Sequence, residues 1–220
     1  MSLYFITGTD TECGKTTATS LLAEHFTKQN KNTITQKWIQ TGAAENHNDI
    51  DEHLKYLKLS KQEHDMFLKH MCPYKFKLAS SAHLAAKKEN IEINIATILE
   101  SVEILKENFK TVLIEGLGGI CVPINNTQTT LDILTHINAK IIIVVQNKLG
   151  CINHSLLTAN AIKQANLNCV GFILNNKEIN LDPVIAKDTP EIIQSQTNLP
   201  LLAEISNKKV LTIKSKLLYT

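Results

Sequence analysis

The chain has 220 residues, of which 43% are apolar and 20% charged, so it can bury a sizeable core as one unit. Its net charge of +2 gives no sign of the clustered basic face that nucleic acid requires. The longest apolar run, 141–145, is far too short to cross a bilayer, and a strand predicted from residue 3 leaves no room for a signal peptide. We therefore expect a single domain over residues 1–220, with no nucleic-acid or membrane partner.

The cysteines give a prediction about redox compartment. There are five, at positions 13, 72, 121, 151 and 169, and no two of them form a CxxC pair. An odd, scattered set indicates reduced thiols rather than a disulfide framework or a zinc site. We expect a cytoplasmic protein.

The first predicted elements are a strand over residues 3–7, a loop over residues 8–16 and a helix over residues 17–26. The loop reads Gly-Thr-Asp-Thr-Glu-Cys-Gly-Lys-Thr, with one residue more between its glycines than the usual four. In such a loop Gly14 lets the backbone approach phosphate oxygens, and the amides of the loop and first helical turn bind the anion. Lys15 supplies a charge at the β- and γ-phosphates, and the Thr16 hydroxyl can ligate Mg²⁺. The pattern predicts a variant phosphate-binding loop (P-loop).

The following elements alternate between strands and helices. A second strand is predicted over 33–37, short helices over 49–59 and 61–70, and a helix with one apolar stripe over 95–109. Continuous apolar runs at 111–115, 140–145 and 169–174 are typical of strands buried on both faces, and a further helix opens near 150 and runs to about 165. This order predicts an α/β fold with a doubly wound, mostly parallel sheet of the P-loop NTPase type.

Chemically useful residues follow several of these strands. Seven of the eight glycines lie just after a predicted strand end, at the sheet edge where α/β proteins hold their ligands. Lys37 and Thr41 follow the second strand, and Glu115 stands where related NTPases have a second metal-binding acid. The helix that opens after Gly150 offers free amides as another anion site. These residues predict a nucleotide and metal site at this edge.

Six segments, in matching order and spacing over residues 3–176, resemble the dethiobiotin synthetase family: 8–16, 37–42, 73–76, 81–85, 115–119 and 148–154. The resemblance implies ring closure of 7,8-diaminononanoate with CO₂ to dethiobiotin, driven by ATP and Mg²⁺, in biotin biosynthesis. It also implies a homodimer with the substrate near the interface.

The resemblance also assigns roles to residues. Lys15, Lys37 and Thr11 would act on the reacting phosphate and carbamate. Thr16, Glu115 and an aspartate would hold Mg²⁺; Asp49 and Asp51 compete for the third place, and Asn48-Asp49 fits the family pattern better. Thr41 would lie near the diamine, and Gly150, Cys151, Ile152 and Asn153 would hold the substrate carboxylate from the partner subunit. The implied nucleotide-binding residues are Glu12, Cys13, Gly14, Lys15, Thr16, Thr17, Glu115, Gly116, Leu117, Gly118, Asn175 and Asn176.

The chain departs from the family towards its C-terminus. Segment 199–205 matches, but Ser206 stands where proline is usual, and the tail 208–219 lacks the family pattern and is expected to form a solvated, charged face. We therefore expect weaker base discrimination than is normal for the family. His83 and His154 gain interest only because they lie in matched motifs. The other histidines, expected to be surface or partly buried polar residues, are His25, His47, His53, His64, His70 and His136.

Three other classes share this kind of loop. A partitioning-type ATPase switch would have a lysine four residues before the second glycine, where this chain has Asp10. A GTPase would have Asn-Lys-x-Asp, and both 147–150 and 176–179 lack the aspartate. A cobyrinate synthetase would need a glutaminase domain, for which no chain remains. The switch is the main alternative to the synthetase.

Overall fold

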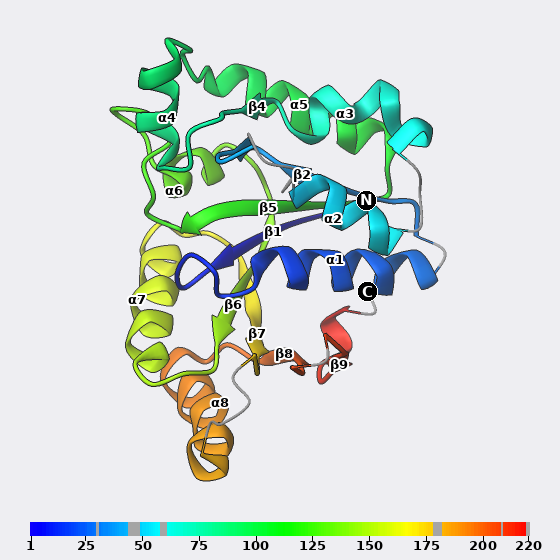
Figure 1. The fold of residues 1–220 in the computed structure, drawn as a ribbon. Coiled ribbons are helices and arrows are strands. Elements are labelled where there is room, and N and C mark those ends of the chain that lie inside the picture. Colours follow the sequence, from blue (N-terminus) through cyan, green and yellow to red (C-terminus); the bar gives the residue numbers. More distant parts are fainter. Residues whose placement is uncertain (30, 44–48, 58–60, 178–181, 208, 219–220) are drawn as a thin grey trace.

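A seven-stranded sheet forms the centre of the computed structural model, which describes the chain except for residues 30, 44–48, 58–60, 178–181, 208 and 219–220 (Figure 1). The strand order is β2-β5-β1-β6-β7-β8-β9, and all neighbours are parallel except β8 and β9. Short strands β3 and β4 pair separately, in parallel. The strands are β1 (Ser2–Gly8), β2 (Thr33–Lys37), β3 (Ile39–Gln40), β4 (Tyr74–Lys75), β5 (Thr111–Gly119), β6 (Lys140–Gln146), β7 (Cys169–Asn175), β8 (Leu201–Ile205) and β9 (Leu211–Ile213).

Helices cover the sheet, with α1 and α2 packed together in front of it in Figure 1. The connections β1–β2 and β6–β7 run in opposite directions along the sheet, and right-handed crossovers then place α1 and α7 on opposite faces. The α-helices are α1 (Lys15–Lys28), α2 (Asp49–Leu57), α3 (Leu68–Met71), α4 (Ala82–Glu89), α5 (Ile95–Asn108), α6 (Thr130–Leu134), α7 (Cys151–Gln164) and α8 (Pro183–Thr197); 3₁₀ segments are η1 (Lys61–Phe67) and η2 (Lys216–Leu218).

The order of the strands locates the ligand crevice. Neighbours β1 and β6 send their following connections in opposite directions, which makes their boundary a topological switch point. Ligands of open α/β sheets bind outside the carboxyl ends of the strands at such a point. The loop 8–14 leaves β1 at this place.

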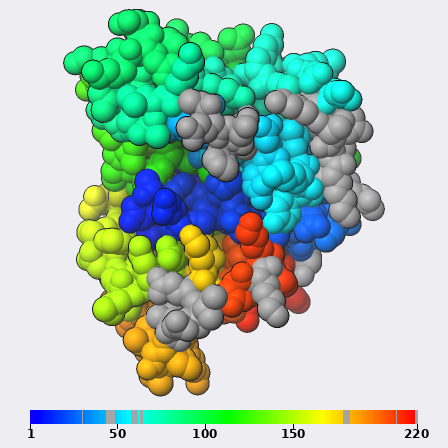
Figure 2. Space-filling model, viewed as in Figure 1, coloured from blue at the N-terminus to red at the C-terminus, as the bar shows by residue number. Residues whose placement is uncertain are grey.

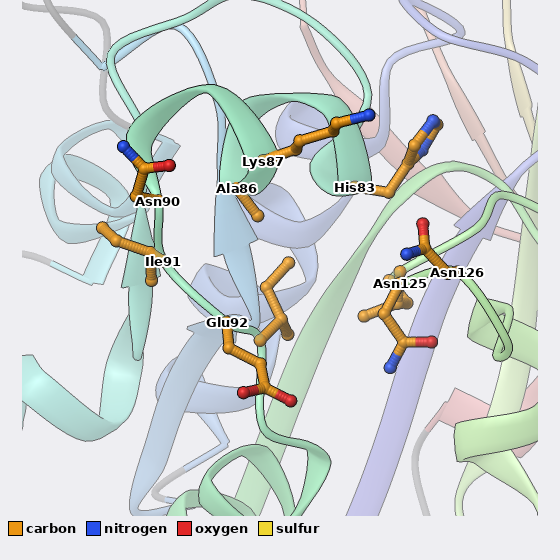
Figure 3. Close-up of a pocket in the computed structure, with 10 residues that line it drawn as sticks. His83, Ala86, Lys87, Asn90, Ile91, Glu92, Asn125 and Asn126 are labelled. Atoms are coloured by element: carbon orange, nitrogen blue, oxygen red, sulfur yellow. The ribbon is translucent and has the colours of Figure 1, made fainter.

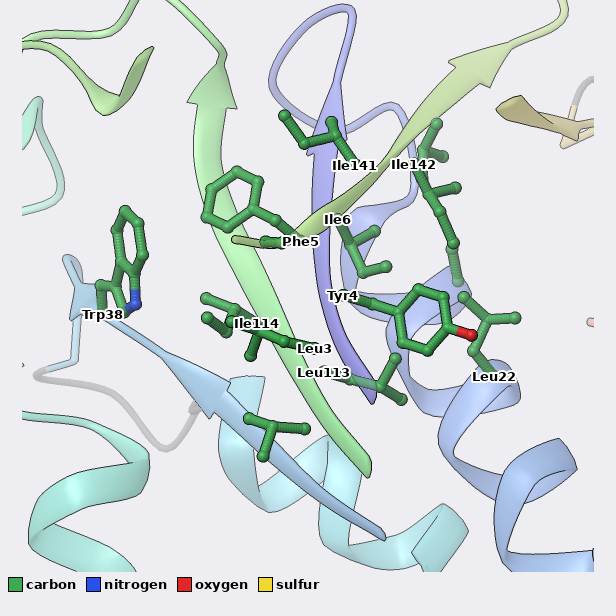
Figure 4. Packing of buried hydrophobic residues seen from close by; sticks show 14 of the residues in the cluster. Leu3, Tyr4, Phe5, Ile6, Leu22, Trp38, Leu113, Ile114, Ile141 and Ile142 are labelled. Atoms are coloured by element: carbon green, nitrogen blue, oxygen red, sulfur yellow. The ribbon is translucent and has the colours of Figure 1, made fainter. Parts of the chain in front are cut away.

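Alternating side chains of β1 pack the two faces of the sheet (Figure 4). Tyr4 stacks on Phe26 of α1 with ring centroids 5.3 Å apart, and Phe5 lies on the other face against Trp38 at 5.0 Å. All four rings are buried in one apolar cluster that runs through the described residues. This packing holds β1, and therefore the loop after it, between α1 on one face of the sheet and Trp38 on the other.

The predicted fold class is confirmed, and differences from expectation are local. Segment 61–70 forms the 3₁₀ segment η1 followed by α3 rather than one α-helix, and the expected helix from Asp49 ends at Leu57, with 58–60 outside the described residues. The tail was expected to be a solvated face; instead β9 adds an antiparallel edge strand and Leu218 is buried. No helix in the described ranges has the length and apolar character needed to cross a membrane.

Candidate active site

The loop between β1 and α1 is held by a contact with β7. Gly14 has φ of +102°, and a Cβ built there would lie 2.1 Å from the amide nitrogen of Asn175. That amide donates a hydrogen bond of 2.9 Å to the Cys13 carbonyl. Glycine is therefore required at position 14 both for its backbone conformation and for space. The contact fixes the loop against the carboxyl end of β7.

Lys15 begins α1 and turns back over the loop, where its ammonium donates to the Asp10 carbonyl at 2.8 Å. The side chain is largely buried. Burial is the main cause that lowers the pKa of Lys15, and the neighbouring ammonium of Lys37 adds to this, while Cys13, Glu115 and Asp49 act in the opposite direction. The two lysines therefore lie close enough to interact.

Sheet register brings Lys37 beside Glu115. These residues are Cα partners on neighbouring strands β2 and β5, so their side chains project on the same face. The Lys37 ammonium lies 2.7 Å from Glu115 Oε1 and donates to the Gly116 carbonyl at 3.2 Å. Burial alone would raise the pKa of Glu115 and lower that of Lys37, but mutual attraction outweighs it, so the Glu115 pKa is lowered and the Lys37 pKa raised. Both groups are charged.

Asp49, the first residue of α2, completes the cluster. Its carboxylate lies 3.0 Å from the Lys37 ammonium and 3.2 Å from the Thr16 hydroxyl, which is also 3.0 Å from Glu115. The Asp49 amide donates to the Gln40 side chain at 3.3 Å, so β3 helps to position the helix start. Asp49 and Asp51 were the two candidates for the third metal ligand, and the structure brings Asp49 into this cluster. Asn48, the other residue of the motif that favoured Asp49, lies outside the described residues.

His53 was expected to be a surface or partly buried polar residue, and that expectation is wrong. It is fully buried, and its Nε2 lies 2.8 Å from Glu115 Oε2. The sequence does show that His53 stands one helical turn after Asp49, but burial depends on how α2 packs. His25 and His70 are half-buried and His136 is exposed, as expected. The side chains of His47 and His64 are outside the described set.

A cavity of about 390 Å³ joins these groups. Figure 2 shows that the first part of the chain, in dark blue, reaches the surface of the molecule. Lys177, just after β7, lines it too, and this cation was not foreseen. The lining residues are Thr11, Glu12, Gly14, Lys15, Thr16, Thr17, Lys37, Asp49, Glu115, Gly118 and Lys177.

The other predicted site residues are not among those that line this cavity. Cys13 is buried beneath the loop, Gly116 receives Lys37, and Leu117 continues β5. The Asn176 side chain accepts from Asn147 at 2.9 Å. Thr41 is half-exposed after β3. Residues 150–153 open α7, with Gly150 and Asn153 exposed, Ile152 half-buried and Cys151 buried.

A second cavity, of about 570 Å³, lies between α4 and the loop around Asn125 (Figure 3). His83 and Lys87, one turn apart on α4, line it together with Asn126, and none of its lining residues belongs to the P-loop cavity. His83 Nδ1 is buried without a hydrogen-bond partner in the described part of the chain. His154 is exposed on the first turn of α7. Neither histidine contacts the P-loop cluster.

The donor set of the P-loop cavity suits a hard cation. The Thr16 hydroxyl lies within hydrogen-bonding distance of the carboxylates of both Asp49 and Glu115, and oxygen ligands are those that Mg²⁺ prefers. The Lys37 ammonium contacts both carboxylates, and the cations Lys15 and Lys177 line the same cavity. Over the described residues, no group of three or more His, Cys, Asp or Glu side chains could hold a metal by itself. A metal bound here therefore needs further oxygen ligands from phosphate or water.

A P-loop between the first strand and first helix of a parallel sheet, with acids on the neighbouring strand and helix, defines a P-loop NTPase. Solved structures agree on the fold. The MinD cell division protein of Aquifex aeolicus superposes with a TM-score of 0.57 at 14% identity, covering 100% of this chain and 85% of that one. A ParA family ATPase from Chlorobium tepidum superposes with a TM-score of 0.54 at 16% identity, covering 94% of this chain and 85% of that one.

Sequence comparison identifies the family. The family model described as an AAA domain matches residues 3–215. ATP-dependent dethiobiotin synthetase BioD 2 of Haemophilus influenzae is 39% identical over 79% of this chain and 90% of its own length. ATP-dependent dethiobiotin synthetase BioD of Legionella pneumophila (strain Paris) is 33% identical over 92% of both chains. The chain belongs to the family of ATP-dependent dethiobiotin synthetases.

Proposed function

We propose that this protein closes the ureido ring of dethiobiotin from 7,8-diaminononanoate and CO₂, with conversion of ATP to ADP and phosphate. The observation that carries the proposal is the meeting of two lysines, Lys15 and Lys37, with Thr16, Asp49 and Glu115 on the wall of one cavity. The loop lysine suits a triphosphate. The second lysine, held by two carboxylates, suits an anionic acceptor beside it.

The reaction needs positioning and charge neutralisation rather than a protein nucleophile. One substrate amine takes up CO₂ as a carbamate, and a carbamate oxygen attacks the γ-phosphate with loss of ADP. The second amine then attacks the carbonyl carbon of the mixed anhydride and expels phosphate. In this scheme Lys15 and Lys37 neutralise the transferred phosphoryl group and the carbamate, and Thr11 and the loop amides bind phosphate oxygens.

Thr16, Asp49 and Glu115 are the residues that would hold Mg²⁺. When bound, the metal would neutralise charge on the β- and γ-phosphates. Glu115 serves two groups in this proposal, because the same oxygen, Oε1, faces both Lys37 and Thr16. Its buried position keeps this charge out of water, where it would be screened.

In this proposal, residues outside the cavity wall bind the carboxylate end of the substrate and the nucleotide base. Thr41 would contact the diamine, and the amides of Gly150, Cys151, Ile152 and Asn153 would bind its carboxylate from a second subunit. A homodimer is supported by two apolar side chains near this helix start, Leu149 at 88% exposure and Leu157 at 60%. The base would lie near Asn175 and Asn176, and the reaction would take place in the cytoplasm.

An ADP-release assay with one component omitted at a time tests the proposal. Rapid ADP formation should require the diamine and bicarbonate together with ATP and Mg²⁺. An ATPase switch of the partitioning type would instead hydrolyse ATP without the diamine. Full-rate turnover in its absence would reject the synthetase mechanism.

A further inference from the structure

His53 and Asp49 reach the same cluster from one helix. They are four residues apart on α2, and side chains with this spacing lie on the same helical face. Asp49 contacts Lys37 and Thr16, while His53 contacts Glu115 on β5. The exposed fractions of the two side chains in the His53–Glu115 pair are 0% and 1%, so water does not compete for the contact.

The direction of the hydrogen bond follows from the charge of Glu115. An ionised carboxylate only accepts hydrogen bonds, so His53 Nε2 must be the donor. The other ring nitrogen, Nδ1, is buried and has no partner among the described residues. His53 is therefore a buried donor that is directed at one oxygen of the Glu115 carboxylate.

The two oxygens of Glu115 are divided between different neighbours. Oε1 faces Lys37 at 2.7 Å and Thr16 at 3.0 Å, whereas Oε2 faces His53 at 2.8 Å. The terminal torsion of a glutamate is broad and has little preference of its own. The plane of the carboxylate is therefore set by its hydrogen bonds, and His53 supplies the one directed away from Thr16.

We propose that His53 is a positioning residue that holds Glu115 with one oxygen towards Thr16, and so raises the affinity of the site for a divalent cation. This inference rests on the proposed function, which assigns Thr16, Asp49 and Glu115 to the metal. Outer partners that orient a ligating carboxylate typically change metal affinity by about 10–100-fold when removed. The alternative is a histidine that only fills space between α2 and β5.

Metal binding, rather than turnover, separates these two roles. Mn²⁺ is titrated into the full-length protein with ADP, and free Mn²⁺ is measured by electron paramagnetic resonance. His53→Leu keeps much of the volume but removes the donor, and should weaken Mn²⁺ binding about 10–100-fold. His53→Gln places an amide nitrogen near the position of Nε2, and should stay within about threefold of the native protein. Thermal unfolding of each variant is recorded alongside.

A matched control comes from a histidine away from the cavity. His70 on α3 is half-buried, and its Nδ1 lies 3.4 Å from the Ser101 hydroxyl. His70→Leu should leave Mn²⁺ affinity unchanged. A folded His53→Leu protein with native Mn²⁺ affinity would overturn the proposal, as would equal loss of affinity in folded His53→Leu and His53→Gln.

Two further arms keep the test decisive. If His53→Leu does not fold, His53→Asn replaces it, because the shorter amide cannot reach Glu115; its affinity should fall while that of His53→Gln is retained, and equal affinities would overturn the role of His53. Glu115→Gln tests the metal assignment separately. If that variant binds Mn²⁺ normally, the proposed metal site fails and the inference fails with it. If Glu115→Gln loses Mn²⁺ but His53→Leu does not, only the inference about His53 fails.

Discussion

Removing the ammonium of Lys37 should destabilise the protein strongly as well as inactivate it. In Lys37→Met, Glu115 keeps its burial but loses the cation 2.7 Å away, and Asp49 loses the same partner at 3.0 Å. Methionine has nearly the same length as lysine, so packing changes little. The change therefore isolates the charge.

The magnitude can be worked from these contacts. At an effective dielectric constant of about 20, unit charges 2.7 Å apart attract by about 6 kcal/mol. Part of this offsets the cost of burying the ions, and breaking a buried pair by removing one partner typically costs about 3–5 kcal/mol. We expect the free energy of unfolding to fall by about this amount, a large part of the roughly 5–15 kcal/mol that stabilises a typical protein.

Urea unfolding measures the loss, followed by circular dichroism and by fluorescence of Trp38. Trp38 is the single tryptophan, is fully buried and adjoins Lys37 in sequence. Lys28→Met is the matched control, because Lys28 pairs with Glu24 at 2.9 Å on the surface of α1. Such an exposed pair is worth about 0.3–0.5 kcal/mol. A loss in Lys37→Met no larger than in this control, with an unchanged urea slope, would refute the reasoning.

Four other predictions concern charge, metal and base. Lys15→Ala and Lys37→Ala should each lower kcat in the ADP-release assay by about 10²–10³, the scale for losing one transition-state partner; full activity in either removes that lysine from the mechanism. Asp49→Asn should raise the Mg²⁺ concentration for half-maximal rate and Asp51→Asn should not, because Asp49 contacts both Thr16 and Lys37; the reverse result would reassign the ligand. CTP and GTP should support measurable turnover, because the Asn175 amide already donates to the Cys13 carbonyl and the Asn176 side-chain oxygen already accepts from the Asn147 amide; a preference for ATP above about 10⁴-fold over every other triphosphate would contradict this. Since the Glu115 pKa is lowered on folding, its stabilising contribution is complete above the ordinary value of 4.5 and is lost as pH falls below it; urea midpoints between roughly pH 6 and pH 3 should therefore drop more in the native protein than in Glu115→Gln.

The parallel sheet could be predicted because its central strands carry a strong local signal. Runs such as 140–145 are apolar on both faces, and the structure has β6 over Lys140–Gln146. Elements with weaker signals were missed. Helix α8 contains Pro190, and α4 is only eight residues long. Strand β9 is three residues long and lies in a basic tail, so its pairing with β8 depends on tertiary contacts rather than on its own pattern.

The residues of the candidate site likewise include some that the sequence predicted and some that it did not. The loop, Lys37 and Glu115 were predicted because each follows a recognisable strand, and parallel strands bring their carboxyl ends to one edge. The burial of His53 was not predicted, although the sequence carried a signal for it: His53 shares helical spacing with Ile50, Leu54 and Leu57, the other buried residues of α2. Lys177 was missed because its place in the cavity depends on how the chain leaves β7.

The most direct test of the synthetase function is to quantify both products of one reaction. Purified protein is incubated with ATP, Mg²⁺, bicarbonate and 7,8-diaminononanoate; dethiobiotin is measured by mass spectrometry and ADP by a coupled assay. The account predicts equal amounts of dethiobiotin and ADP, with neither formed rapidly when the diamine is omitted. ADP formation at the full rate without dethiobiotin would contradict it.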